Sequence, residues 1–183
     1  MGGLPASPTP AKTKTSRRTT NDMVEAGNED GIVLVTGASG YIGSHIVANL
    51  LSKGRAVRGT VRDSSDPERI GHLRDMEVAE GGSLEIVEMD LLDGDSVHGA
   101  VSGCSSVIHT AAVVVLKSKR PQEKIVDPSV IGTKNVLHAI DASGTVECIV
   151  HTSSTAAIRP QNWTDGQTLT TASWADDATI ENN

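Results

Sequence analysis

Residues 33 to 43 read Val-Leu-Val-Thr-Gly-Ala-Ser-Gly-Tyr-Ile-Gly. This stretch begins as an apolar run typical of a buried strand, breaks at Gly37, Gly40 and Gly43, and continues as the apolar pattern of a helix. In such a turn the first glycine permits the bend, the second lets the backbone approach phosphates, and the third lets helix and strand pack closely. The helix N-terminus also favours an anion through its free N–H groups and its dipole. The stretch therefore predicts that a dinucleotide binds here through its pyrophosphate.

Short β-branched runs alternate with helical segments after residue 31. We expect strands at 32–36, 56–61, 84–89, 105–110 and 146–152 and helices at 41–53, 66–79, 94–102 and 122–142. Strands separated by helices pair in parallel through right-handed crossovers. The sequence therefore predicts an α/β fold with a doubly wound parallel (Rossmann) sheet, of which this chain forms the N-terminal half with five strands. Pro121 suits the first turn of the fourth helix, whereas Pro128 falls inside that helix and should kink it.

The N-terminal residues differ in composition from the rest of the chain. Residues 1–20 are rich in Pro, Ser, Thr, Gly, Lys and Arg and contain no acidic residue, and residues 21–30 are polar and acidic. Neither segment carries enough apolar surface to fold. We therefore expect a disordered tail over residues 1–30 and a single NAD(P)-binding Rossmann domain over residues 31–183, incomplete at its C-terminus.

Charge and cysteine content exclude several classes of protein. A formal net charge of −7 argues against nucleic acid as a partner. No apolar run approaches the roughly 20 residues that cross a bilayer, so we expect no membrane association. Cys104 and Cys148 lie far apart without the spacing of metal ligands, which suits buried thiols in a reducing compartment. We therefore expect a cytoplasmic protein without a metal site. Organelle targeting by the basic tail is the weaker alternative, because no amphipathic arginine helix is present.

The end of the second strand indicates which cofactor binds. An acidic residue there, about 20 residues after the glycine motif, binds the ribose 2′-hydroxyl of NAD, whereas an arginine accommodates the 2′-phosphate of NADP. Arg62 occupies this position, and Arg69 could add a second contact from the next helix. A charge-assisted hydrogen bond contributes about 1.5–3 kcal/mol, so the sequence favours NADP (NADPH) over NAD. The alternative is that Arg62 forms a surface ion pair with Asp63.

Two further strand ends carry candidate cofactor contacts. Asp90 follows the third strand, where its carboxylate could accept a hydrogen bond from the adenine amine or cap the next helix, and both interpretations stay open. Thr110, Ala111 and Ala112 follow the fourth strand. Small residues there would let the backbone pass beside the nicotinamide ribose.

In combination, these motifs make the chain similar to the extended short-chain dehydrogenases/reductases, the NAD-dependent epimerase/dehydratase superfamily. It most resembles the branch of dihydroflavonol reductase and cinnamoyl-CoA reductase, over about residues 31–183. The segments that carry the resemblance are 36–44, 60–63, 90–91, 107–112, 127–137 and 151–154. The resemblance implies NADP-dependent reduction of a small-molecule carbonyl substrate. It also implies a homodimer formed through the fourth helix.

The resemblance implies roles for individual residues as well. Ser154 matches the catalytic serine that hydrogen-bonds the substrate carbonyl. The residues that match cofactor contacts are Thr36, Gly37, Ser39, Gly40, Tyr41, Ile42, Gly43, Arg62, Arg69, Asp90, Leu91, Thr110, Ala111 and Ala112. Within this set, Ser39 joins the two arginines at the 2′-phosphate, Asp90 and Leu91 match adenine contacts, and Ala111 lies beside the cofactor.

The chain departs from the family pattern in one respect. The family protonates the forming alkoxide with a Tyr whose pKa is lowered by a Lys four residues later on the same helix face. Tyr41, the single tyrosine, lies in the glycine motif, and the sequence ends at Asn183, before the expected Tyr-x-x-x-Lys helix. We therefore expect the NADP(H)-binding part of a carbonyl reductase, inactive as a 183-residue chain and with one sheet face partly uncovered.

Two alternatives to this interpretation remain open. The first is a non-catalytic NADP(H)-binding sensor or pseudoenzyme, which would bind the cofactor without turnover. The second is a fragment of an NAD-dependent sugar epimerase or a 3β-hydroxysteroid dehydrogenase. Arg62 argues against the epimerase, because NAD-retaining enzymes favour an acidic residue near the end of the second strand.

Overall fold

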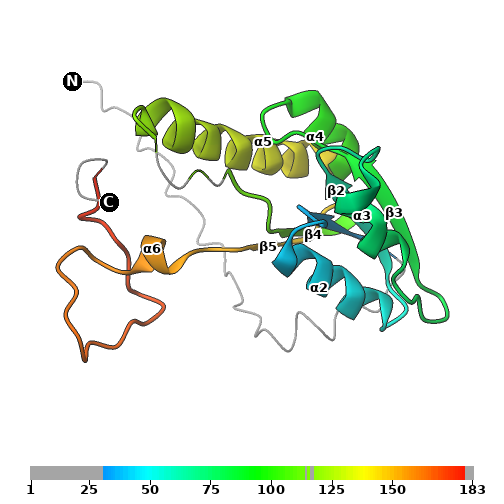
Figure 1. Cartoon of the computed structure of the whole chain (residues 1–183), viewed down its shortest axis with the longest axis horizontal. Coiled ribbons are helices and arrows are strands. Elements are labelled where there is room, and N and C mark those ends of the chain that lie inside the picture. Colours follow the sequence, from blue (N-terminus) through cyan, green and yellow to red (C-terminus); the bar gives the residue numbers. More distant parts are fainter. Residues whose placement is uncertain (1–30, 114, 116–117, 180–183) are drawn as a thin grey trace, which may run out of the picture. The chain divides into compact units, whose positions relative to one another are not determined.

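The computed structural model describes residues 31–113, 115 and 118–179 (Figure 1). Its centre is a five-stranded sheet with the strand order β3-β2-β1-β4-β5, and all four neighbouring pairs are parallel. Because the order runs outward from β1 in both directions, it confirms the predicted doubly wound sheet. The tail predicted over residues 1–30 lies outside the described residues.

Strands and helices alternate along the chain as predicted. They are β1 (Ile32–Thr36), α2 (Tyr41–Leu51), β2 (Ala56–Val61), α3 (Pro67–Arg74), β3 (Ser83–Glu88), α4 (Gly94–Val101), β4 (Cys104–His109), η1 (Gln122–Val126), α5 (Asp127–Ser143), β5 (Cys148–His151) and α6 (Thr155–Ile158). The largest difference from prediction is that α3 ends at Arg74 rather than at residue 79. The residues after it turn back toward α2, where the Ala79 N–H donates to the Leu51 carbonyl oxygen.

Helices lie on both faces of the sheet (Figure 1), and a separate apolar core joins them to each face. On one face, Leu51 of α2 and residues of α3 pack around Val35. On the other face, Val97 of α4 and Val136 of α5 pack around Leu34. Because successive strand residues point to opposite faces, neighbouring positions of β1 serve different cores. The two cores thus fix the helices against the sheet, and the ends of the strands stay available for a ligand site.

Side-chain caps explain where two of these helices begin. Asp66 accepts hydrogen bonds from two backbone N–H groups at the start of α3. Asp93 does the same at the start of α4. Such caps satisfy N–H groups that a helix leaves without partners, and each contributes about 1 kcal/mol. At the C-terminal end of α5, Gly144 takes the left-handed conformation that commonly ends a helix.

The segment around Pro128 corrects one prediction. Pro128 does not kink the middle of a continuous α-helix. Instead, Gln122–Val126 forms a π-helical turn, and α5 begins at Asp127 with the proline in its first turn. The proline is tolerated there because the wider π turn before it interrupts the regular α-helical hydrogen bonds that its ring and missing N–H would break. The Ser129 hydroxyl donates to the Ile125 carbonyl oxygen over 2.6 Å, which satisfies one carbonyl of the π turn.

The described helices leave part of one sheet face uncovered, as predicted. Ile149 of β5 packs in the core below α4 and α5, so Val150 points to the opposite face. The side chain of Val150 is 48% exposed. Within the described residues, no helix is both long and apolar enough to cross a membrane.

Candidate dinucleotide site and adjoining pocket

The glycine turn between β1 and α2 is closely packed. Gly37 has a left-handed φ of 67°, and a Cβ atom there would lie 3.1 Å from the Ala111 Cα. The Gly40 N–H donates to the Gly37 carbonyl oxygen over 3.0 Å. A Cβ atom at Gly43 would lie 2.3 Å from that same oxygen. The turn and the start of α2 therefore require glycine at positions 37 and 43.

The N-terminus of α2 has features that suit an anion. Its N-cap, Gly40, has no side chain that could occupy the first N–H groups, and the first helical turn contains no acidic residue. Ser39 is half-buried in the turn, and Tyr41 and Ile42 are largely exposed. The Tyr41 ring makes an edge contact with the His45 ring. A negatively charged group could therefore approach this helix end without repulsion from a carboxylate.

The end of β2 is tied to the glycine turn by two hydrogen bonds. The Gly37 N–H donates to the Thr60 hydroxyl over 3.1 Å, and the Ala38 N–H donates to the Thr60 carbonyl oxygen over 2.9 Å. Arg62 follows two residues later. The strand end that carries this arginine is therefore held beside the turn that is predicted to bind the pyrophosphate.

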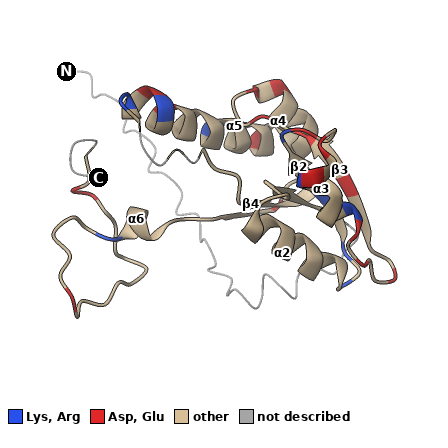
Figure 2. Ribbon diagram, viewed as in Figure 1, with Lys and Arg blue, Asp and Glu red and all other residues tan. Residues whose placement is uncertain are grey.

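The two predicted arginines differ in their surroundings. Arg62 is exposed, and no described residue forms an ion pair or hydrogen bond with it. Asp63 instead accepts hydrogen bonds from the Ser65 hydroxyl and N–H, which lower the pKa of its carboxyl. The alternative of an Arg62–Asp63 ion pair is therefore wrong. Arg69 pairs with the capping carboxylate of Asp66 at 3.0 Å, on a helix where Figure 2 shows basic and acidic residues interspersed.

The hydroxyl of Thr36 joins the ends of β1 and β4. It accepts hydrogen bonds from the Thr110 and Ala111 N–H groups, both at 3.0 Å, and lies 2.7 Å from the Nδ1 atom of His109. Thr36 is fully buried. The structure therefore gives this residue the role of organising the backbone of residues 110–111, beneath the surface that a cofactor could touch.

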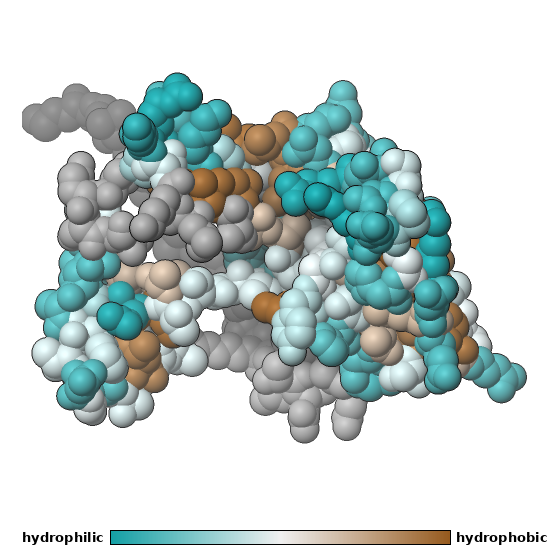
Figure 3. All heavy atoms as spheres, in the orientation of Figure 1, coloured by the Kyte–Doolittle hydropathy of each residue, from teal (hydrophilic) through white to brown (hydrophobic). Residues whose placement is uncertain are grey.

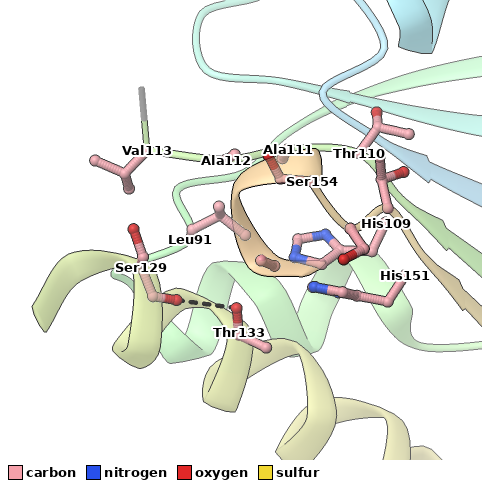
Figure 4. Close-up of a pocket in the computed structure, with 13 residues that line it drawn as sticks. Leu91, His109, Thr110, Ala111, Ala112, Val113, Ser129, Thr133, His151 and Ser154 are labelled. Atoms are coloured by element: carbon pink, nitrogen blue, oxygen red, sulfur yellow. Dashed lines mark hydrogen bonds between the residues drawn. The ribbon is translucent and has the colours of Figure 1, made fainter. Parts of the chain in front are cut away.

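A pocket of about 340 Å³ opens next to these strand ends (Figure 4). The residues that line it are Leu91, His109, Thr110, Ala111, Ala112, Val113, Ser129, Thr133, His151, Thr152, Ser153, Ser154 and Ala157. It thus brings together five of the predicted site residues, from three separate strand ends. The glycine-motif residues and the two arginines do not line it.

The segment after β3 excludes one of the two interpretations of Asp90. Its carboxylate accepts a hydrogen bond from the Leu92 N–H over 2.9 Å, and the cap of the next helix is Asp93. The helix-cap interpretation of Asp90 is therefore wrong. Leu91 is held against α5, because its carbonyl oxygen accepts from the Asn135 side-chain amide over 2.8 Å.

Ser154 lies at the pocket and also caps a helix. Its hydroxyl oxygen accepts a hydrogen bond from the Ala156 N–H over 3.1 Å at the start of α6. A hydroxyl that accepts one bond still has its proton to donate. Ser154 could therefore cap α6 and donate a hydrogen bond to a ligand oxygen.

Two histidines that were not predicted as site residues line the pocket. His109 and His151 face each other in the β4–β5 register, with ring centroids 5.1 Å apart. Burial, followed by the neighbouring His151, lowers the pKa of His109 to about 4. The signal in the sequence was their common position at the ends of two neighbouring parallel strands. His109 is therefore uncharged at neutral pH.

The chemistry that the pocket offers is limited. Its described lining contains hydroxyls and two imidazoles but no Tyr, Lys or carboxylate. Tyr41 lies on α2 instead. Among the described residues, no group of three or more His, Cys, Asp or Glu could hold a metal ion. The pocket can therefore bind and orient a ligand, but it lacks the acid–base pair of a Tyr-Lys reductase.

Comparison with known proteins identifies one family, whose curated members are longer than this chain. The sequence profile of the 3-beta hydroxysteroid dehydrogenase/isomerase family matches residues 34–175. Cinnamoyl-CoA reductase 1 of Petunia hybrida is 43% identical over 146 residues, which cover 79% of this chain and 42% of that protein. The chain thus spans less than half the length of this relative. The match confirms the resemblance to the branch that contains cinnamoyl-CoA reductases.

Solved structures that are similar to this chain are also nicotinamide-dependent reductases and dehydrogenases that it matches over part of their length. Yeast methylglyoxal/isovaleraldehyde reductase, complexed with NADPH, superposes with a TM-score of 0.66 at 28% identity over 82% of this chain and 45% of that chain. A variant of uronate dehydrogenase from Agrobacterium tumefaciens, complexed with NAD, superposes with a TM-score of 0.54 at 27% identity over 71% and 43% of the two chains. Both nicotinamide cofactors therefore occur among the structural neighbours. The profile match covers most of the described domain and shows that the chain belongs to the 3-beta hydroxysteroid dehydrogenase/isomerase family of extended short-chain dehydrogenases/reductases.

Proposed function

We propose that this chain binds NADP(H) and forms the cofactor-binding part of a carbonyl reductase. The observation that carries the proposal is the exposed guanidinium of Arg62, which no described residue pairs, at a strand end tied to the glycine turn through Thr60. An arginine at this place favours a ribose 2′-phosphate over a free 2′-hydroxyl. The relative that is complexed with NADPH supports the same choice. NAD is the weaker alternative.

The second part of the proposal concerns the substrate. When bound, the cofactor would supply a hydride to a small-molecule carbonyl compound. Ser154 would donate a hydrogen bond to the carbonyl oxygen, because its hydroxyl proton is not used by the cap of α6. The small side chains of Ala111 and Ala112 leave room beside it. Protonation of the product oxygen in this family uses a Tyr-Lys pair, and the described lining of the pocket contains neither residue, so we expect no turnover by the 183-residue chain alone.

Two observations bear on the alternatives. The absence of Tyr and Lys from the described pocket lining favours a non-catalytic NADP(H)-binding sensor as the second candidate. Arg62 argues against an NAD-dependent epimerase fragment, because an arginine there would replace the acidic residue that binds the ribose hydroxyls.

Oligomeric state and location complete the proposal. Figure 3 shows apolar side chains gathered over α5, and Val130, Ile131 and Leu137 of that helix are each about half exposed. Burial of a large aliphatic side chain contributes about 1.5–3 kcal/mol. We therefore expect a homodimer through α5. The two free cysteines suit a reducing compartment, so we expect the protein in the cytoplasm. Sedimentation velocity of the wild-type chain tests the dimer.

Cofactor binding is tested by titrating the full chain with NADPH and with NADH and following cofactor fluorescence. We expect NADPH to bind about 10- to 100-fold more tightly than NADH, which corresponds to about 1.5–3 kcal/mol. Arg62→Glu should remove this preference. Arg120→Ala is the control, because Arg120 lies before α5 in an exposed ion pair with Glu123. A wild-type chain that binds neither cofactor would overturn the proposal.

Catalysis is tested separately by following NADPH oxidation with a hydroxycinnamoyl-CoA ester and with a dihydroflavonol. Binding of NADPH without oxidation would agree with the proposed cofactor-binding part. Oxidation at rates typical of enzymes, about 1–1000 per second, would show that another residue supplies the proton.

A further inference from the structure

We propose that His109 is held as the Nε2–H tautomer and presents that N–H to an uncharged oxygen atom of a ligand in the pocket. The inference deepens the proposed function, on which its ligand contact rests. It concerns a residue that was not predicted to belong to the site.

The first step is the hydrogen bonding of Thr36. A hydroxyl can accept two hydrogen bonds and donate one. Both acceptor positions of Thr36 are used by the N–H groups of Thr110 and Ala111. The remaining bond, to Nδ1 of His109, must therefore be donated by the hydroxyl. Nδ1 is then the acceptor, and the proton of the neutral ring lies on Nε2.

The second step is the direction of the remaining donor. Nδ1 points to Thr36, which does not line the pocket, so the opposite edge of the ring, with Nε2, is the part that does. Figure 4 shows the ring inside the pocket beside His151. His109 is 3% exposed. Among the described residues no other group hydrogen-bonds to its ring, and no bond joins the two imidazoles. Nε2 is not one of the fully buried atoms that lack a partner, so it is accessible from the pocket, where a ligand oxygen can accept a hydrogen bond from its N–H.

The third step is the kind of acceptor. An anionic group such as a phosphate would favour a charged imidazolium. A charged ring would place a proton on Nδ1 and break the bond from Thr36, whose oxygen has no position left for a third donor. The hydrogen bonds around Thr36 therefore favour an uncharged acceptor. A ribose hydroxyl or an amide carbonyl of a nucleotide fits this requirement.

Two measurements test the inference. Nitrogen-15 NMR of the ligand-free full chain at neutral pH distinguishes the tautomers, because protonated and unprotonated imidazole nitrogens resonate far apart. We expect a protonated Nε2 and an unprotonated Nδ1 for His109. A protonated Nδ1, or rapid averaging of the two forms, would overturn the inference whether or not a cofactor binds.

The second measurement compares two substitutions. His109→Asn keeps an acceptor near Nδ1 but removes the Nε2 donor, and His109→Gln keeps a donor near Nε2 but removes the acceptor. We expect His109→Asn to weaken NADPH binding about 3- to 10-fold, as for one neutral hydrogen bond. His109→Gln should bind more tightly than His109→Asn although it unfolds more easily. Thermal unfolding of both variants identifies any variant that is not folded.

The outcomes separate this inference from the proposed function. If NADPH fails to bind the wild-type chain, the proposed function fails, and the ligand contact fails with it, while NMR still decides the tautomer. If NADPH binds the wild-type chain and a folded His109→Asn variant equally, the proposed function stands and the ligand contact is overturned. If NMR confirms the tautomer and the asparagine variant weakens binding, both parts of the inference hold.

Discussion

A Cβ atom at Gly43 would lie 2.3 Å from the carbonyl oxygen of Gly37, so the first turn of α2 rests directly on the glycine turn. We predict that Gly43→Ala displaces α2 and destabilises the domain by about 1–3 kcal/mol, the usual cost of overpacking. It should also abolish binding of NADPH, because the N–H groups at the helix end would move. Urea unfolding and fluorescence titration measure the two effects.

Gly99 of α4 provides the matched control for this substitution. A Cβ atom at this position meets no other atom within 4 Å. Gly99→Ala should therefore stabilise the domain by about 0.5–1 kcal/mol, the gain expected from helix propensity. If Gly43→Ala were equally stabilising, the close contact between α2 and the turn would not exist.

Arg58 gives a prediction about stability away from the site. Its guanidinium donates to the carbonyl oxygens of Ala100 and Ser102 at the end of α4 and pairs with Glu85 at 2.7 Å. The arginine side chain is 14% exposed. Arg58→Met should therefore lower the free energy of unfolding by about 1.5–3 kcal/mol, because charged hydrogen bonds are lost in a partly buried place.

The exposed pair of Arg120 and Glu123 is the comparison for Arg58. Both of its side chains are more than half exposed. Arg120→Met should change the free energy of unfolding by less than about 0.5 kcal/mol, as for other surface pairs. Urea unfolding of the two variants under the same conditions measures the difference, and equal effects would contradict a structural role of Arg58.

Thr60 gives a prediction about the anchoring of the glycine turn. Its hydroxyl accepts the hydrogen bond from the Gly37 N–H, and its side chain is buried. Thr60→Val should cost about 1 kcal/mol, because it leaves the partly buried N–H of Gly37 without its partner. Thr60→Ser keeps the hydroxyl and should bind NADPH more tightly than the valine variant in a fluorescence titration. Equal affinities would show that the hydrogen bond does not position the turn.

The buried imidazole of His109 predicts a pH dependence of stability. Its pKa falls from about 6.5 in the unfolded chain to about 4 in the folded chain. The unfolded state therefore binds more protons between these values, and the free energy of unfolding falls as the pH falls from 6.5 to 4. The loss from this group is about 3 kcal/mol, and below pH 4 it contributes no further change.

Urea unfolding of the wild-type chain and of His109→Asn between pH 4 and 6.5 measures how much His109 contributes to the pH dependence of the free energy of unfolding. The wild-type chain should lose stability more steeply than the variant, which has no titrating group at this position. His72→Gln on α3 is the control for a histidine that is exposed. If the free energy of unfolding falls equally with pH in the wild-type chain and in His109→Asn, burial does not keep the His109 ring neutral.

Several elements could be predicted from sequence because local patterns determine them. The glycine turn and the alternation of β-branched and helical segments depend on backbone sterics and hydrophobic periodicity, which residues 32–61 display clearly. The position of Arg62 at the end of β2 follows from that alternation. The end of α3 was missed because Ala79 bonds to the end of α2, a contact between segments that local patterns do not contain.

The pocket could be predicted only in part. Asp93 rather than Asp90 caps α4, because the chain makes an additional turn between them, closed by a hydrogen bond from the Asp93 N–H to the Asp90 carbonyl oxygen. His109 and His151 could be placed on strand ends, but their meeting depends on the register of β4 and β5. Register, loop geometry and shared hydrogen bonds are set by tertiary packing, and these determine the pocket.

The π-helical turn at Gln122–Val126 has a consequence for how this segment tolerates changes in length. A π turn holds one residue more than an α turn, and one residue rotates a helix by about 100°. Deleting a single residue there would convert the turn to α-helix and redirect the chain that precedes it, and it would place Pro128 inside a continuous α-helix at a cost of about 3 kcal/mol. Ser129 and Thr133, which face the pocket from α5, would keep their places. A change in length at the entrance to this helix would thus leave the pocket wall in place, but the ring of Pro128 would be confined within an α-helix.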